Sequence, residues 1–233
     1  MSAPLLVGLL DSGVAAELDA RVMASRRFRL DPSREVEGLA GGGDALGHGT
    51  ALARVIVAGA PRARLLDARI FEGTMATSAA VAAAGLDWLV AQRADLVNMS
   101  FGLREDRAVL RQACARAAAG GAILLGAAPA RGAPVYPGAY AGVIRVSGDA
   151  RCAPDEVSVL GGGQADFGAH PRPSQGFEGE GPAGGASFAV PHLCAILAAF
   201  LGRHRQAGRA EARHHLEAIA CYHGPERRSS AND

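Results

Sequence analysis

Short, mostly apolar runs alternate with segments of helical periodicity, and this alternation constrains the fold more than any other feature of the sequence. Each run is too short for a buried helix and is bounded by polar, glycine or proline residues, as buried strands are. The expected strands are Leu5–Leu10, Ala63–Phe71, Leu96–Met99, Ala122–Gly126 and Val143–Ser147, and the expected helices between them are Thr50–Val57, Thr77–Ala91 and Arg107–Ala119. The pattern predicts an α/β fold with a mostly parallel, doubly wound sheet and helices on both faces.

The rhythm changes after Val143, where the sequence becomes rich in glycine and proline. Two further strands are expected at Val157–Leu160 and Gln164–Phe167, followed by helices at Ala186–Gly202 and Arg209–Cys221. The glycine-rich stretches lie between elements of one continuous alternation and do not resemble interdomain linkers. We therefore expect a single domain over residues 1–228 and a disordered tail over residues 229–233.

The charge balance restricts the class of partner. The 24 basic residues are all arginine and face 23 acidic residues, so the net charge is +1. No long block of one sign suggests a nucleic-acid or membrane-surface binder, and the longest apolar stretches fall short of the roughly 20 residues that span a bilayer. The absence of lysine from the sequence excludes phosphate-loop, Schiff-base and Ser-Lys chemistry. We expect neither a nucleic-acid nor a membrane partner.

Cysteine and histidine positions bear on compartment and metals. The four cysteines lie far apart without a Cys-x-x-Cys pair, which favours reduced thiols in a cytoplasmic protein. His214, His215, Cys221 and His223 fit no standard zinc spacing. We expect no metal and no other cofactor.

Three polar segments are placed where chemistry is expected in such a fold. Asp11 ends the first strand, His48 precedes a helix within Gly-His-Gly, and Ser187 begins another helix among small residues. A nucleophilic serine needs a base to accept its proton, and the base needs a carboxylate to fix its tautomer. Asp11 could instead simply end a strand, His48 start a helix and Ser187 cap one. Their occurrence together, in the order Asp, His, Ser, predicts a catalytic triad.

At these motifs the chain resembles the subtilisin-like serine proteases. The likeness rests on Asp11-Ser12-Gly13, His48-Gly49-Thr50 and Gly185-Ala186-Ser187-Phe188-Ala189-Val190-Pro191-His192, and it extends to Val97–Gly102 and Tyr136–Gly138. It implies that Ser187 attacks the scissile carbonyl, that His48 is general base and then acid, and that Asp11 orients His48. It also implies that substrate pairs as an added strand with Ser100, Phe101 and Gly102, opposite a wall formed by Gly126, Ala127 and Ala128.

Two departures from the family pattern affect the oxyanion hole. Pro129 stands where the resemblance places an asparagine donor, and Ala186 replaces the threonine before the nucleophile. The hole therefore has fewer donors around Ser187, unless Gln164 or a backbone N–H near residues 130–132 takes the role. Losing the asparagine donor costs subtilisin roughly 10²–10³ in turnover.

Slow intrinsic turnover suits a specialised protease. Because only ten residues precede Asp11, we expect neither a signal peptide nor a prodomain, and we expect no structural calcium. The predicted partner is a peptide or protein substrate, one specific leader-bearing polypeptide. A weak or inactive peptide-binding module and a triad esterase remain alternatives. Phe188 and Cys194 are expected in the core, and Glu178 and Glu180 in a solvated loop that could otherwise meet a basic substrate segment.

Overall fold

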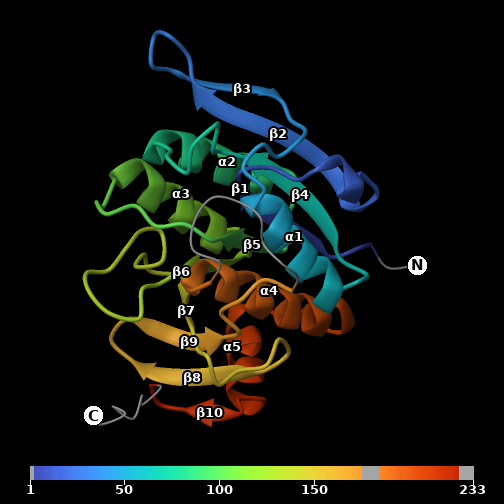
Figure 1. The fold of residues 1–233 in the computed structure, drawn as a ribbon, viewed down its shortest axis with the longest axis vertical. Coiled ribbons are helices and arrows are strands. Elements are labelled where there is room, and N and C mark those ends of the chain that lie inside the picture. Colours follow the sequence, from blue (N-terminus) through green and yellow to red (C-terminus); the bar gives the residue numbers. More distant parts are fainter. Residues whose placement is uncertain (1–2, 175–183, 226–233) are drawn as a thin grey trace, which may run out of the picture.

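A ten-stranded sheet forms the centre of the protein in the computed structural model, which describes residues 3–174 and 184–225 (Figure 1). The strand order is β10-β8-β9-β7-β6-β5-β1-β4-β2-β3, and the pairs from β2 through β9 are parallel. The strands are β1 (Leu6–Asp11), β2 (Val22–Leu30), β3 (Val36–Ala40), β4 (Arg64–Arg69), β5 (Leu96–Met99), β6 (Ile123–Ala127), β7 (Val143–Gly148), β8 (Val157–Gly162), β9 (Ala165–Ala169) and β10 (Tyr222–His223).

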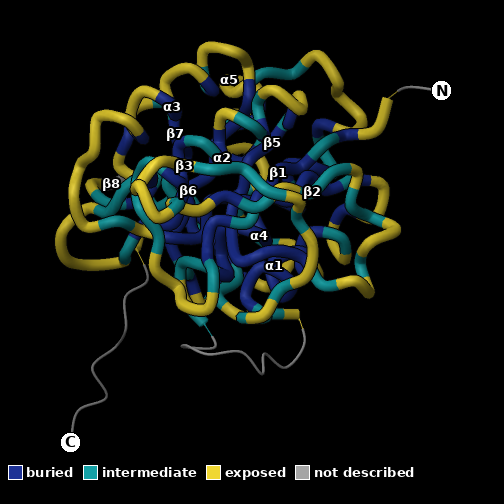
Figure 2. Tube along the Cα trace, turned by 90° about the horizontal axis from the view of Figure 1, so that it is seen from above, coloured by how far each residue is buried: buried dark blue, intermediate teal, exposed yellow. Residues whose placement is uncertain are grey.

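Helices cover both faces of the sheet, as the alternating pattern predicts. The helices are η1 (Ala16–Arg21), α1 (His48–Gly59), α2 (Ala79–Ala91), α3 (Ala108–Ala119), α4 (Ala186–Arg203) and α5 (Arg209–Ala218). Helices α1 and α4 share one hydrophobic core with the sheet, and α2 and α3 share another on the opposite face. Figure 2 shows the buried chain concentrated in the sheet and in α1 and α4.

Helix α4 is the most deeply placed helix and carries the predicted nucleophile near its start. Its 18 residues are long and apolar enough to cross a membrane by length and composition, but 61% of them are buried inside the domain. Helix α4 packs against β5, β6 and β7. An apolar helix surrounded by other side chains in this way is a core helix of a globular domain.

The sequence missed a hairpin at one margin of the sheet. Strands β2 and β3 pair antiparallel around a turn in which the Asp31 carboxylate accepts the N–H of Glu35 at 2.9 Å. Strand β2 is mostly half-buried or exposed and rich in arginine, so it lacks the apolar run that marks the central strands. The Asp31-Pro32-Ser33 turn was the available signal.

The other expected elements are confirmed with ends shifted by up to three residues. The tail 229–233, Glu178 and Glu180 lie outside the described residues. The chain order reverses at β1, because β4 lies on one side of β1 and β5 on the other. In open α/β sheets such a reversal places the functional groups beyond the carboxyl ends of the strands.

Candidate active site

Asp11 and His48 form a hydrogen-bonded pair at the carboxyl end of β1. Asp11 Oδ1 lies 2.7 Å from His48 Nδ1, and the Asp11 side chain is completely buried. A carboxylate without solvent access fixes the orientation of the ring and favours the tautomer that carries its proton on Nδ1. Nε2 is then the nitrogen left to act as a base.

The segments that carry these two residues are bound to each other. Ser12 Oγ accepts the N–H of Gly49 at 2.8 Å, and Thr50 Oγ1 accepts the N–H of Ala15 at 3.0 Å. A Cβ built on Gly49 would lie 2.3 Å from the carbonyl oxygen of Gly13, so only glycine permits this approach. The residues that follow Asp11 and His48 in the two motifs therefore fix the two segments next to each other, so that the Asp11 and His48 side chains can meet.

Asp44 holds the start of α1 and was missed by the sequence analysis. Its carboxylate accepts the N–H groups of Leu46, Gly47 and Thr50 and the hydroxyl of Thr50, at 2.6–3.1 Å. This is the arrangement of a helix cap, and an aspartate shortly before a predicted helix was the signal that could have revealed it.

The environment of His48 raises the pKa of its imidazole above the ordinary value of about 6.5. Burial lowers this pKa, but the charge of Asp11 and the hydrogen bond to it together outweigh burial, and the charge of Asp44 adds to them. A stabilised imidazolium is what a general base needs after it accepts the serine proton.

Ser187 occupies the first turn of α4, on the same cavity as His48. The cavity has a volume of about 540 Å³, and both side chains line it together with Ser100, Phe101 and Gly102. Gly185, with φ of 110°, turns the chain into the helix, and the earliest N–H groups of a helix have no acceptor in a preceding turn. These N–H groups are suited to a developing oxyanion.

Phe188 and Cys194 are confirmed as buried core residues. Both side chains are 0% exposed, and the ring of Phe188 stands edge-on to His48 with centroids 5.7 Å apart. Phe188 therefore supports the imidazole from behind. Burial raises the pKa of the Cys194 thiol to about 12, so this cysteine stays protonated and unreactive.

The predicted substrate segment follows β5 directly. Ser100 is buried and accepts a hydrogen bond from the Asn98 side chain at 2.9 Å, while Gly102 is exposed. Leu103 then exchanges two backbone hydrogen bonds with Tyr136, of 2.6 and 2.9 Å. The segment is thus fixed at its buried end and by its pairing partner, as a template for an added strand must be.

The side chain of Val135 packs against Gly102, in one predicted wall of the pocket for the residue before the cut. A Cβ built on Gly102 would lie 2.7 Å from Val135 Cγ2, and one on Gly126 would lie 2.8 Å from the Cα of Gly138. The loop from Val135 to Gly138 therefore joins the Gly102 wall to the wall formed by Gly126, Ala127 and Ala128. The isopropyl group of Val135 occupies the space beside Gly102 that a larger side chain at that position would need.

Pro129 and Ala186, the two departures from the family pattern, face a common cavity, and Ala186 directly precedes the nucleophile in the sequence. They line one cavity of about 490 Å³ together with Gly184 and Gly185. Neither side chain can donate a hydrogen bond. Gln164, offered as a replacement donor, donates from its amide nitrogen to the carbonyl of Gly132 and lines a cavity together with Pro129.

Comparison with known proteins identifies the family of this chain. The family named Subtilase, Peptidase_S8, matches residues 3–231. The chain belongs to the subtilase family. Its fold is that of the subtilases, and within the described residues no group of three or more His, Cys, Asp or Glu side chains could hold a metal ion.

Three similar proteins show how far the likeness extends along the chain. The chain is 31% identical over 153 residues to the thermostable alkaline protease of Halalkalibacterium halodurans, covering 60% of this chain but only 40% of that protein. It is 25% identical over 238 residues to subtilisin DY of Bacillus licheniformis, covering 92% of this chain and 82% of that protein. The solved structure of a protease from Pseudoalteromonas arctica has the same fold, with a TM-score of 0.71 at 19% identity, over 92% of this chain and 82% of that one.

Proposed function

We propose that this subtilase is an active endopeptidase that removes a leader segment from one specific partner polypeptide in the cytoplasm. The observation that carries the proposal is the pairing of a complete Asp11-His48 base, on one cavity with Ser187, with side chains at Pro129 and Ala186 that cannot donate to an oxyanion. Such a site can form an acyl-enzyme but has fewer donors to accelerate the step.

The chemistry follows from the positions of the three residues. His48 Nε2 accepts the proton of Ser187 Oγ as that oxygen attacks the substrate carbonyl, while Asp11 stabilises the imidazolium. The tetrahedral oxyanion faces the N–H groups at the start of α4. Collapse of the intermediate transfers the proton to the leaving amine, and water then releases the acyl group by the reverse sequence of proton transfers.

Three further features of the chain support the proposal. Val135 fills the space beside Gly102, in the predicted wall of the pocket for the residue before the cut, which favours a small residue there. All four cysteines are free thiols, as is usual in a reducing compartment. In its small size and its arginine-rich, lysine-free composition the chain also resembles the leader-removing subtilisin-like protease of quinohemoprotein amine dehydrogenase maturation.

A fluorophosphonate serine probe tests whether the nucleophile is activated. We expect intact-mass measurement to show one probe molecule attached to the purified wild-type protein and none attached to the Ser187→Ala variant. An unlabelled wild-type protein, correctly folded, would contradict the protease proposal. It would favour a peptide-binding module, the alternative that the two missing donors support.

Substrate range is tested by comparing protein N-termini in host cells that express the wild type or the Ser187→Ala variant. A leader-removing protease is expected to create one or a few new N-termini, each preceded by a small residue. Many new N-termini without a shared pattern would contradict processing of a single partner while leaving the protease activity intact.

A further inference from the structure

Another cavity lies at the opposite end of the domain from the active site. Its volume is about 750 Å³, and Leu5, Ala60 and Ala198, all nearly buried, form part of its apolar floor. Arginine side chains surround this floor: Arg21, Arg62, Arg64, Arg203 and Arg205. We call it the arginine cavity.

The same three elements that carry the triad lead to the arginine cavity. Strand β1 ends at Asp11 and starts beside Leu5, α1 starts at His48 and ends beside Ala60, and α4 runs from the Ser187 turn to Arg203. In Figure 1 the far ends of α1 and α4 meet on the side of the amino terminus. At 1.5 Å per residue, α4 separates the two sites by about 24 Å.

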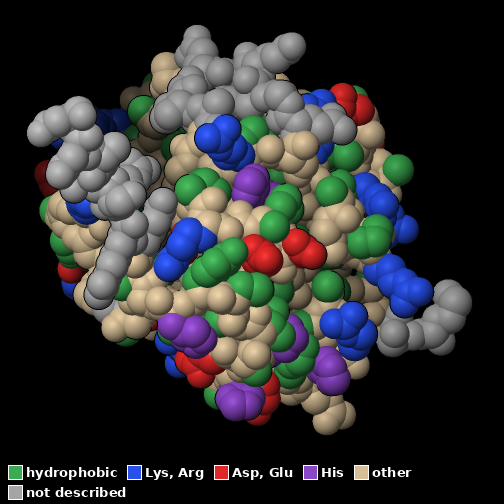
Figure 3. Space-filling view, turned by 60° about the horizontal axis from the view of Figure 1, so that its bottom comes forward, with side chains coloured by type: hydrophobic (Ala, Val, Ile, Leu, Met, Phe, Trp, Pro, Cys, Tyr) green, Lys and Arg blue, Asp and Glu red, His purple; other side chains and the backbone are tan. Residues whose placement is uncertain are grey.

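The cavity carries uncompensated positive charge. Arg21 donates to the carbonyl of Pro61 and Arg64 to that of Ala20, contacts that position the guanidinium groups without neutralising them. Among the described residues, only one of these five arginines forms an ion pair: Arg205 contacts Asp95 at 3.2 Å. Figure 3, which turns this end partly into view, shows basic side chains along its right-hand margin.

The chemistry of the cavity favours carboxylates on a peptide over a compact anion. Phosphate sites are usually built from N–H groups at helix N-termini, but α1 and α4 both reach this cavity with their C-termini, whose carbonyls repel a concentrated negative charge. A peptide can instead spread its carboxylates over the rim, where guanidinium groups bind them bidentately, and lay apolar side chains on the floor.

We propose that the arginine cavity binds an acidic segment of the protein substrate, remote in sequence from the cleaved bond. The inference rests on the proposed function and adds to it the feature that selects the partner. An extended chain needs at least about seven residues to cover 24 Å, so the acidic segment lies further than this from the scissile bond. Two linked contacts raise affinity for a polypeptide that carries both and leave other peptides slow to react.

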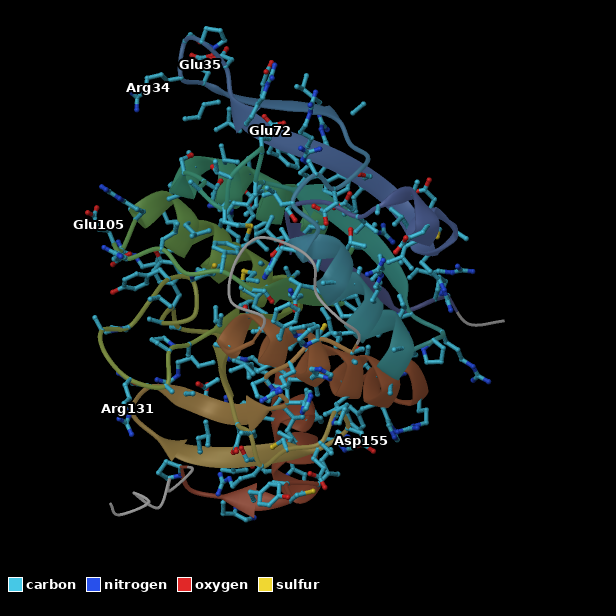
Figure 4. The ribbon with its side chains drawn as sticks, in the orientation of Figure 1. Arg34, Glu35, Glu72, Glu105, Arg131 and Asp155 are labelled. Carbon is cyan, nitrogen blue, oxygen red and sulfur yellow. The ribbon has the colours of Figure 1, made fainter. Side chains whose placement is uncertain are left out.

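Binding is tested on the full-length Ser187→Ala protein, which cannot cleave the probe. The probe is a fluorescein-labelled 16-residue peptide of alternating glutamate and leucine pairs, about the length needed for two contacts with the rim. In the control peptide every glutamate is replaced by glutamine. Anisotropy is measured at rising salt. The double variant Arg62→Glu/Arg203→Glu reverses charge at the cavity, and Arg34→Glu/Arg116→Glu makes the same net change elsewhere, with Arg34 at the tip of the β2–β3 hairpin (Figure 4).

We expect the acidic peptide to bind, the glutamine peptide to bind at least tenfold more weakly, and affinity to fall with salt. The cavity variant should lose at least tenfold in affinity and the control variant less than twofold. Equal losses in both variants, no binding of the acidic peptide, or displacement by millimolar inorganic phosphate would overturn the proposal.

The design separates this proposal from the protease proposal. Arg62 and Arg203 are exposed, so the double variant is expected to fold, and thermal unfolding verifies this; the single Arg62→Glu variant serves if it does not. Fluorophosphonate labelling of the wild type reports on the triad alone. If the wild type is labelled but the acidic peptide does not bind, the proposed role of the arginine cavity is refuted and the protease proposal still holds.

Discussion

Replacing Val135 with glycine is expected to widen the pocket that receives the residue before the cleaved bond. The isopropyl group approaches Gly102 so closely that a Cβ there would lie 2.7 Å from Cγ2 and 2.9 Å from Cβ of Val135. Its removal vacates about the volume by which leucine exceeds alanine. The wild-type protein should therefore favour alanine, and the Val135→Gly variant should accept leucine.

The size of this change follows from the energetics of hydrophobic pockets. One methylene in such a pocket is worth about 1–3 kcal/mol of discrimination, or about 10–200-fold. Leucine would fill only part of the vacated space, because Val135 is half-buried and one side of the pocket is open. We expect the ratio of kcat/KM for leucine over alanine to rise about 100-fold, which corresponds to about 2.7 kcal/mol.

The assay compares fluorogenic peptides that differ only in the residue before the cut. Val36→Gly is the matched control, since Val36 is exposed at the start of the edge strand β3. A leucine-to-alanine ratio within twofold of the wild type, in a folded Val135→Gly protein, would refute the role assigned to Val135. A wild-type enzyme that cleaves after leucine as fast as after alanine would do the same.

Further outcomes are expected for the triad, for the oxyanion hole and for one buried aspartate. Asp11→Asn should lower kcat by about 10⁴ with little change in KM, because an amide no longer fixes the tautomer of His48; a change confined to KM would contradict this. The rate needs neutral His48, whose pKa is raised, so kcat/KM should fall as the pH drops through that pKa. Asp44→Asn should move this limb of the pH profile to lower pH, and an unmoved limb would contradict the role of its charge. Pro129→Asn should raise kcat by at least tenfold if the new amide reaches the oxyanion, since one such donor is worth about 10²–10³; an unchanged kcat in a folded variant would show that the hole is completed elsewhere. Burial raises the pKa of Asp67 to about 7, so the unfolding free energy should fall by up to about 4 kcal/mol as the pH rises from about 4 to 7, and Asp67→Asn should flatten that fall in urea titrations.

The central sheet could be predicted because its strands are buried on both faces. Runs such as Leu96–Met99 are continuously apolar only where helices cover them, so the sequence records the environment of the strand directly. Strands β2 and β3 lack that signature, because their positions are only partly buried and their pairing depends on the neighbouring β4. The sequence could not show where a half-exposed hairpin would attach.

The sequence could propose a triad because the chemistry of a triad requires particular residue types in particular local settings. Asp11 had to follow a strand, and Ser187 had to begin a helix among small residues, and both requirements are visible in the sequence. Asp44 and Val135 were missed because neither has a reactive side chain in an unusual setting. Their importance comes from what lies next to them in space.

The amino-acid sequence by itself determined the α/β class and the parallel core of the sheet, and it predicted Asp11, His48 and Ser187 as the triad, because hydrophobic periodicity and residue chemistry are local properties. The tertiary structure alone decided the 2.7 Å contact between Asp11 and His48, the filling of the pocket wall by Val135, and the gathering of five arginines from separate segments around one cavity. These features join residues distant in sequence, and only the packing of helices against the sheet fixes which of them meet.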